Sequence, residues 1–309
     1  MKKLRLALLS GGKSAEREVS LKSGGQVFQA LDKNRYDIQR YDPQTDLNRL
    51  IADAPHLDVA LIIMHGRWGE DGTIQGLLDL LELPYQGSGV MGSAVAMNKE
   101  VSKMLYRQAG LNVPRTVFFS SQDFIDLEAI EAEVGLPAIV KPVNEGSSIG
   151  VTVARNREEL LPAIQEAMSH DHRILVEEFI SGVEVTSGIL GNHELQALPL
   201  VEIIPSESYP FFNYEAKYKP GATSEIVPAR LSPELTARVQ ECGLKAHRAL
   251  GCRGYSRTDT IIRGDDIYVL ETNTIPGMTA TSLFPQAAAA AGLPLTVLLD
   301  RLVELALEK

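Results

Sequence analysis

The alternation of apolar and polar positions in the first third of the chain predicts a small parallel α/β sheet. The runs expected to form its elements are residues 5–9, 19–31, 36–41, 59–64 and 73–81, with a helix at 19–31. Strands that alternate with helices are typical of parallel sheets. Gly11 and Gly12 open the helix without the GxGxxG spacing of a dinucleotide-binding loop, so another ligand at the helix start is the better interpretation.

The pattern changes at a cluster of glycine and serine at residues 87–93, which predicts a domain boundary. Beyond it we expect a helix at 94–109, strands at 116–119, 138–141, 150–154 and 174–178, and helices near 124–134 and 158–168. A long strand region follows, then a polar segment with aromatic side chains at 206–224, a helix near 233–250, two strands and a closing helix near 295–307. The prediction is an α/β and α+β protein of three domains, over residues 1–93, 94–184 and 185–309.

Composition and charge narrow the functional classes. The 44% hydrophobic and 23% charged residues are ordinary for a globular protein. The net charge of -10 disfavours nucleic acid or an anionic membrane as a partner, because both require clustered Lys and Arg. No run approaches the roughly 18 apolar residues of a membrane span, and the apolar start is too short for a signal peptide. We therefore expect a cytoplasmic enzyme whose cysteines, Cys242 and Cys252, form neither a disulfide nor a zinc site.

Residues 138–150 have the pattern of a flap that binds phosphate. A predicted strand ends at Lys141, and Gly146, Ser147 and Ser148 follow before the next strand. Glycine lets backbone N–H groups approach phosphate oxygens, and the serine hydroxyls add donors. A plain hairpin turn would also explain the Gly-Ser segment, but Lys141 beside it favours phosphate binding.

The end of the following strand is a candidate adenine-binding hinge. Its backbone, at Glu177, Glu178, Phe179 and Ile180, could meet the adenine edge, and Glu184 could accept from ribose hydroxyls. Acidic residues that merely end a strand in solvent are the alternative.

Two neighbouring strands near the C-terminus predict a metal site. Side chains alternate along a strand, so Arg257 and Asp259 share one face of the first strand, as Glu271 and Asn273 do on the second. A three-residue loop at 264–266 would place Asp259 opposite Glu271 and Arg257 opposite Asn273, whereas a two-residue loop would place them on opposite faces. Facing carboxylates repel unless a cation lies between them, and Mg²⁺ prefers such oxygen ligands. We expect Asp259, Glu271 and Asn273 to bind Mg²⁺ and Arg257 to balance phosphoryl charge; a solvated edge hairpin is the alternative.

Together these residues resemble the ATP-grasp superfamily, and within it the D-alanine–D-alanine ligases. The segments that carry the resemblance are 14–20, 65–72, 141–150, 215–218 and 271–279, which span nearly the whole chain. The resemblance implies an ATP-grasp fold with the nucleotide held between the central and C-terminal domains. It implies that a cytoplasmic homodimer uses ATP and a pair of Mg²⁺ ions, with Mn²⁺ as a substitute, to join two D-alanine molecules for peptidoglycan through an acylphosphate.

The resemblance also implies roles for individual residues. The catalytic group is Glu16, Ser147, Tyr218 and Arg257, the substrate-binding group is Glu16, His65, Arg257, Gly277, Ser282 and Leu283, and the phosphate-contacting lysines are Lys99, Lys141 and Lys217. Glu16 would hold the first ammonium, His65 would lie near the first carboxylate, and Ser282 would bind the second carboxylate. Each has a plainer alternative: a helix-dipole partner for Glu16, a turn residue for His65, a solvent-facing lysine for Lys99 and a helix N-cap for Ser282.

A lid and a substrate preference complete the interpretation. Residues 205–220 are the candidate lid, which would exclude water from the acylphosphate. Tyrosine at position 218 accompanies an amine as second substrate in the family, whereas phenylalanine accompanies D-lactate acceptors. No side chain stands out as the base that deprotonates the amine. The rival interpretations are another ATP-grasp ligase and a nucleotide-binding regulator without catalysis.

Overall fold

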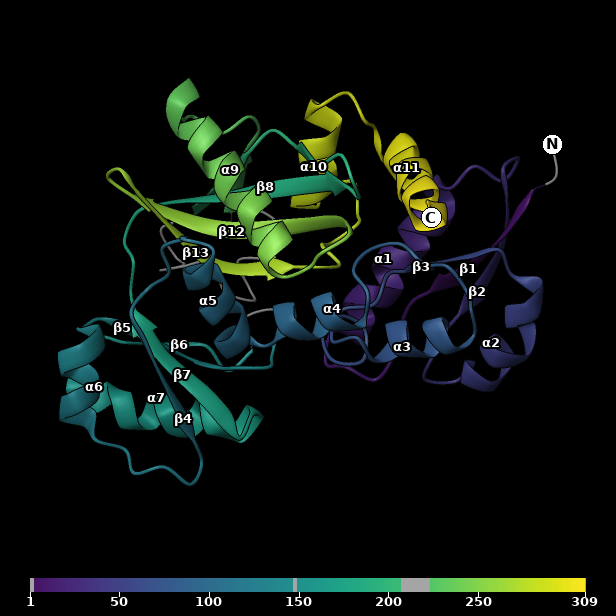
Figure 1. Cartoon of the computed structure of the whole chain (residues 1–309). Helices are drawn as coiled ribbons and strands as arrows, with labels where there is room; N and C mark the ends of the chain where they lie inside the picture. The colour runs from purple at the N-terminus through teal and green to yellow at the C-terminus, as the bar shows by residue number, and fades with distance from the viewer. Residues whose placement is uncertain (1–2, 147–148, 207–222, 309) are drawn as a thin grey trace.

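The computed structural model describes residues 3–146, 149–206 and 223–308, and its strands form three sheets. In Figure 1 the first sheet lies at the right, the four-stranded sheet at the lower left and the six-stranded sheet above it. The observed class is therefore the mixed α/β and α+β architecture that the sequence predicts. Within the described ranges no helix combines the length and apolar character needed to cross a bilayer.

The first sheet is parallel, with the order β2-β1-β3. Its strands are β1 (Leu4–Leu9), β2 (Tyr36–Tyr41) and β3 (Val59–Ile62), and its helices are α1 (Arg17–Ala30), α2 (Leu47–Asp53) and α3 (Thr73–Leu80), with a short 3-10 helix at Ala54–His56. Alternate residues of β1 enter two separate cores: Leu6 and Leu8 pack with α1, and Ala7 and Leu9 pack with α2 and α3. Both faces of β1 are thus buried, as in other parallel sheets.

The predicted helix at 94–109 is wrong, because two helices meet there: α4 (Val90–Met97) and α5 (Lys99–Gln108). Asn98 between them has extended backbone, with ψ 103°, and its side chain accepts from the amides of Glu100 and Val101. An asparagine that caps in this way starts a new helix.

The second sheet has four antiparallel strands in the order β4-β7-β5-β6. They are β4 (Thr116–Ser120), β5 (Ala138–Pro142), β6 (Thr152–Ala154) and β7 (Arg173–Glu178), covered by α6 (Leu127–Val134) and α7 (Arg157–His170). Ile130, Leu160, Ile164 and Val176 are buried between the helices and one face of the sheet. The other face is left to line a cavity.

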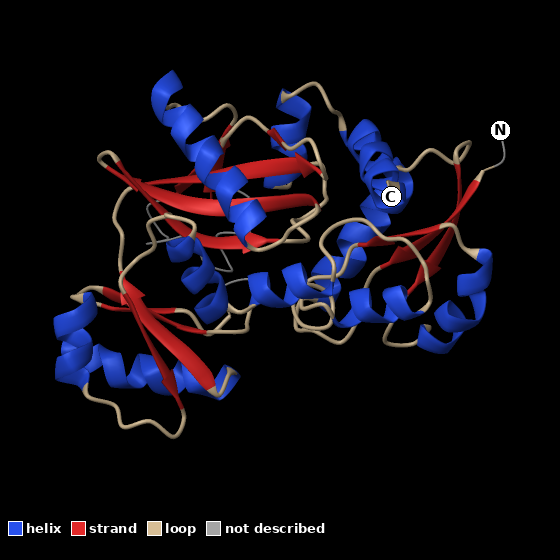
Figure 2. Ribbon diagram, in the orientation of Figure 1, coloured by secondary structure: helices blue, strands red, loops and turns tan. Residues whose placement is uncertain are grey.

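The third sheet has the order β11-β10-β8-β12-β13, with β9 paired to β8. The strands are β8 (Val183–Gly191), β9 (Gln196–Ala197), β10 (Val201–Pro205), β11 (Thr223–Ile226), β12 (Gly254–Arg263) and β13 (Asp266–Asn273), and the helices are α9 (Pro233–Ala249), α10 (Leu283–Ala290) and α11 (Leu295–Leu307). Figure 2 shows α9 lying across this sheet.

The last helix returns to the start of the chain. Leu298, Leu299 and Leu302 of α11 share one core with Leu6 and Leu8 of β1. Residues near the C-terminus therefore stabilise the first sheet. The domain boundaries expected after residues 93 and 184 stay a prediction.

Candidate active site

Two neighbouring cavities lie where the three sheets approach one another. One is lined by the start of α1, the loop after β3, and β12 and β13; the other lies between the second and third sheets. Both are lined by Lys99, Glu145, Gly146 and Glu271. The cavities therefore meet at a lysine and a carboxylate, so a group could pass between a ligand in one and a ligand in the other.

The predicted pairing of the two C-terminal strands is confirmed, although the predicted loop is wrong. Asp259 lies opposite Glu271, and Arg257 lies opposite Asn273. Yet the loop has only two residues, because Arg263 pairs with Asp266. A register shift after Asp259 restores the facing pairs, since Thr260 pairs with Val269 and the intervening Leu270 is the extra residue of a bulge.

Cationic side chains hold both carboxylates of this pair. Arg257 donates from Nε to Asp259 Oδ1 and from Nη2 to Oδ2, both at 2.8 Å. Thr186 Oγ1 donates to Asp259 Oδ1 at 2.7 Å, and Asn273 Nδ2 lies 3.3 Å from Oδ2. Glu271 Oε2 lies 3.6 Å from Lys99 Nζ. Both carboxylates of the acidic pair thus lie beside positive charge.

This donor set is compatible with Mg²⁺. In the described part of the chain, no group of three or more His, Cys, Asp or Glu side chains gathers as a metal cluster. The set consists instead of the facing carboxylates of Asp259 and Glu271 and the amide of Asn273. Mg²⁺ commonly binds through one or two carboxylates and completes its shell with water and substrate phosphates.

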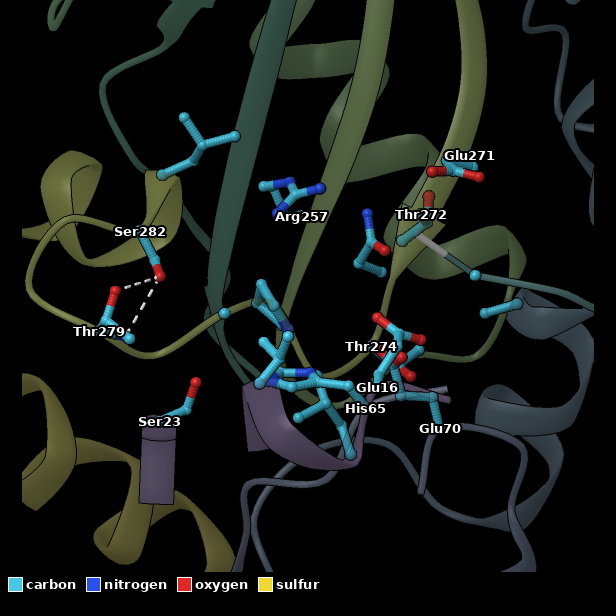
Figure 3. A pocket seen from close by; sticks show the side chains of 18 of the residues that line it. Glu16, Ser23, His65, Glu70, Arg257, Glu271, Thr272, Thr274, Thr279 and Ser282 are labelled. Atoms are coloured by element: carbon cyan, nitrogen blue, oxygen red, sulfur yellow. Dashed lines mark hydrogen bonds between the residues drawn. The ribbon is translucent and has the colours of Figure 1, made fainter. Parts of the chain in front are cut away.

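A second carboxylate pair lies around Gly66. Glu16 is 4% exposed and packs against two glycines, Gly66 and Gly146. A Cβ on Gly66 would lie 2.6 Å from Glu16 Oε2, and a Cβ on Gly146 would lie 3.0 Å from the same atom. Glu70 Oε2 accepts from the Gly66 amide at 2.7 Å. Burial, reinforced by the charge of Glu16, raises the pKa of Glu70 to about 8. Figure 3 shows Glu16, His65 and Glu70 together at one end of the cavity.

The sequence patterns did not identify Glu70 as a residue of the site. It lies inside the segment 65–72 that carries the family resemblance, but a glutamate in a polar loop has no periodicity that would mark it as buried. Only its contact with the Gly66 amide and its closeness to Glu16 single it out.

His65 is a neutral imidazole near the guanidinium of Arg257. Burial, and then the charge of Arg257, lower the pKa of His65 to about 4, against a backbone hydrogen bond with Ile275. Its Nε2 has no hydrogen-bond partner among the described residues. A neutral imidazole carries a single N–H, and with that proton directed to the Ile275 backbone, Nε2 presents an acceptor to the cavity.

Ser282 lies on the other side of the same cavity, at the start of α10 (Figure 3). It occupies the N-cap position, but its side chain makes no capping hydrogen bond. Its Oγ instead accepts from the Thr279 amide at 3.2 Å and contacts Thr279 Oγ1 at 2.8 Å. A Cβ on Gly277 would lie 2.9 Å from Ser282 Oγ, so a larger residue there would require the hydroxyl to move. Gly277, Ser282 and Leu283 all line the cavity.

The second cavity contains the predicted nucleotide residues. Lys99, Lys141, Glu177, Glu178, Phe179, Ile180 and Glu184 all line it. The Glu178 carboxylate is paired with Arg115 at 3.0 Å and with Arg263 at 2.8 Å. The amides of Glu178 and Phe179 donate to Arg115 O and Pro137 O. The Glu178 carboxylate and the amides of Glu178 and Phe179 are therefore engaged with other groups of the protein.

Several predicted site residues belong to segments outside the described part of the chain. Ser147, Ser148, Lys217 and Tyr218 lie outside the described residues, as does most of the candidate lid at 205–220.

Comparisons with known proteins agree with this geometry. The family model "D-ala D-ala ligase C-terminus" matches residues 105–304, and "D-ala D-ala ligase N-terminus" matches 39–88. A D-alanine–D-alanine ligase of Syntrophobacter fumaroxidans is 63% identical over 99% of this chain and 98% of its own length. That of Desulfotalea psychrophila is 53% identical over 99% and 96%.

Solved structures show the same similarity. The D-alanine–D-alanine ligase of Bacillus anthracis in complex with ATP has a TM-score of 0.86 at 33% identity, covering 98% of this chain and 97% of that one. The VanG D-Ala:D-Ser ligase of Enterococcus faecalis has a TM-score of 0.84 at 32% identity, covering 99% and 100%.

Proposed function

The chain belongs to the D-alanine–D-alanine ligase family, and on that premise we propose how its residues join two D-alanine molecules at the expense of ATP. The product is D-alanyl-D-alanine for peptidoglycan, with ADP and phosphate released. The observation that carries the proposal is the Arg257, Asp259 and Glu271 constellation at the junction of the two cavities. A phosphoryl group can pass there from a nucleotide in one cavity to a carboxylate in the other.

The first D-alanine is proposed to bind at the end of the cavity formed by Glu16 and His65. The Glu16 carboxylate would pair with the ammonium, and His65 would lie near the substrate carboxylate. Ser147 and Tyr218 would close over this end, as the family resemblance implies. Holding the carboxylate beside the nucleotide makes its phosphorylation effectively unimolecular.

The nucleotide is proposed to bind between the second and third sheets, with its adenine toward Ile180 and its ribose toward Glu184. Lys99 and Lys141 would contact the phosphates, together with Ser148 and the lid residue Lys217. Asp259, Glu271 and Asn273 would hold Mg²⁺, which supplies neutralisation of the phosphate charge when it is bound.

The second D-alanine is proposed to bind through its carboxylate at Ser282, with the backbone of Gly277 and Leu283. Its amine attacks the carbonyl carbon of the acylphosphate, the C–N bond forms, and inorganic phosphate leaves. Arg257 would stabilise the oxyanion of the tetrahedral intermediate. The ammonium must first lose a proton, and this proposal assigns that proton to no particular base.

The assembly and the location of the protein are further parts of the proposal. We propose a homodimer that works in the cytoplasm, where ATP and D-alanine are available. Light scattering at two protein concentrations would test the assembly, and a monomer at both would refute it.

The test of the function is phosphate release from ATP with D-alanine, L-alanine, D-serine or D-lactate as the added substrate. We expect release with D-alanine and a product with the mass of D-alanyl-D-alanine. L-Alanine is the matched control for simple ATP hydrolysis. Equal release with both alanines, or a mixed D-alanyl-D-serine product at matched concentrations, would contradict the proposal.

The lid residue has its own test. Tyr218→Phe should shift the acceptor preference from D-alanine toward D-lactate. The ratio of dipeptide to depsipeptide from a mixture of both acceptors measures that preference. An unchanged ratio would refute the role of Tyr218.

A further inference from the structure

Lys103 is buried behind the nucleotide cavity, and none of the roles above accounts for it. It is 0% exposed, its partner Glu177 is 1% exposed, and Lys141, on the far side of Glu177, is 8% exposed. Lys103 Nζ lies 2.8 Å from Glu177 Oε2, and Lys141 Nζ is paired with the other carboxylate oxygen, Oε1. One carboxylate is thus shared by two lysines.

All three groups are charged at neutral pH. Burial disfavours ionisation of Glu177, but the two lysine charges outweigh burial and lower the pKa of Glu177 to about 2. Burial lowers the pKa of Lys103 to about 8, opposed by the charge of Glu177. The cluster therefore carries one surplus positive charge, in surroundings where a lone buried charge would be costly.

That surplus charge faces the nucleotide cavity through Lys141. Lys141 and Glu177 line the cavity, and Lys103 does not. If Lys103 were neutral, Glu177 would be balanced by Lys141 alone, and both carboxylate oxygens would compete with a phosphate for the Lys141 ammonium. Lys103 thus determines how much positive charge Lys141 can offer to a ligand.

The helix that carries Lys103 joins the two walls of the cavity. On α5, Lys99 and Lys103 are one turn apart and lie on the same face. Lys99 Nζ donates to Glu145 O at 2.6 Å, while Lys103 contacts Glu177 on β7. From the same helix, Tyr106 OH donates to Thr272 Oγ1 on β13 at 2.7 Å. The helix is therefore fixed to both the second and the third sheet.

We propose that Lys103 is a positioning residue for ATP, which acts through Glu177 to keep the Lys141 ammonium available to the nucleotide phosphates. The inference rests on the proposed function only in that this cavity takes the nucleotide. Because Lys141 and Glu177 line the second cavity and not the first, the effect of Lys103 must appear in nucleotide affinity and not in the binding of D-alanine.

The experiment compares Lys103→Met with the wild-type full chain. We expect a rise of about ten-fold or more in KM for ATP and in Kd for ADP with Mg²⁺, measured by direct titration, and no change in KM for D-alanine. The control Arg107→Met removes a positive charge from an exposed position of α5 that lines neither cavity, and it should leave both nucleotide constants unchanged. An unchanged Kd in Lys103→Met would overturn the proposal.

The double variant Lys103→Met/Glu177→Gln separates charge from packing. It removes one positive and one negative charge, so the surplus on Lys141 returns, and the Kd for ADP should recover to within about three-fold of wild type. Urea unfolding of the single and the double variant establishes that each is folded before its Kd is compared. A folded double variant that binds ADP ten-fold more weakly would refute the charge argument.

Failure of the inference is distinguishable from failure of the proposed function. ADP titration requires no D-alanine, whereas phosphate release by the wild-type protein with D-alanine tests the ligation alone.

Discussion

Replacing Glu70 with glutamine is expected to stabilise the protein selectively at alkaline pH. The change preserves an acceptor for the Gly66 amide, which donates to Glu70 Oε2 at 2.7 Å. It removes the cost of ionising a carboxyl that burial and the neighbouring charge of Glu16 disfavour. The glutamine variant therefore reports the electrostatic contribution with little change in packing.

The sign and size of the effect follow from the raised pKa, from 4.5 to about 8. A group whose pKa is raised by folding contributes stability that is complete below its unfolded pKa and is lost as pH rises through the folded value. The window is therefore from about pH 4.5 to about pH 8. One pKa unit corresponds to about 1.4 kcal/mol, so the whole shift has a ceiling of about 5 kcal/mol. Between pH 6 and pH 9 the ceiling is about 3 kcal/mol, and because the side chain is only partly buried we expect about 1–2 kcal/mol.

The assay is urea unfolding of wild type and Glu70→Gln at pH 6, 7.5 and 9, without nucleotide, D-alanine or divalent cation. The difference in unfolding free energy should grow in favour of Glu70→Gln as the pH rises. Glu241→Gln, at an exposed position of α9, is the matched control and should show no such growth. If wild type and Glu70→Gln lose stability in parallel from pH 6 to pH 9, Glu70 is not held protonated and the reasoning is wrong.

Three further substitutions test other parts of the structure. Asp259→Asn should lower kcat by about a hundred-fold or more and raise the Mg²⁺ concentration needed for half-maximal activity, because a hard anionic ligand is lost; an unchanged Mg²⁺ titration would argue against the metal site. Tyr106→Phe removes the donor to Thr272 Oγ1 and should cost about 1–2 kcal/mol in urea unfolding; an equal or higher midpoint would show that the bond contributes nothing. Gly182→Ala would place a Cβ 2.1 Å from Ile262 O and should destabilise the protein by about 1–3 kcal/mol. Wild-type thermal stability would mean that the backbone at Gly182 and strand β12 can move apart at no cost.

The sequence alone predicted much of the fold, because hydrophobic periodicity is a local property. The strand at 36–41 and the closing helix at 295–307 have the predicted bounds. The facing of Asp259 and Glu271 was also predicted, but from the wrong loop length. The bulge at Leu270 that corrects the register leaves no mark in the alternation of side chains.

What only the tertiary structure decided are contacts between segments far apart in the chain. No pattern indicates that Lys103 shares the Glu177 carboxylate with Lys141, or that the final helix completes the core of the first sheet. Likewise, the low exposure of Glu16 arises only when the loop at Gly66 and the flap at Gly146 close around it. Periodicity determines which face of a helix or strand is apolar. The pairing of buried charges depends instead on which helices and strands come into contact, and only the folded chain determines those contacts.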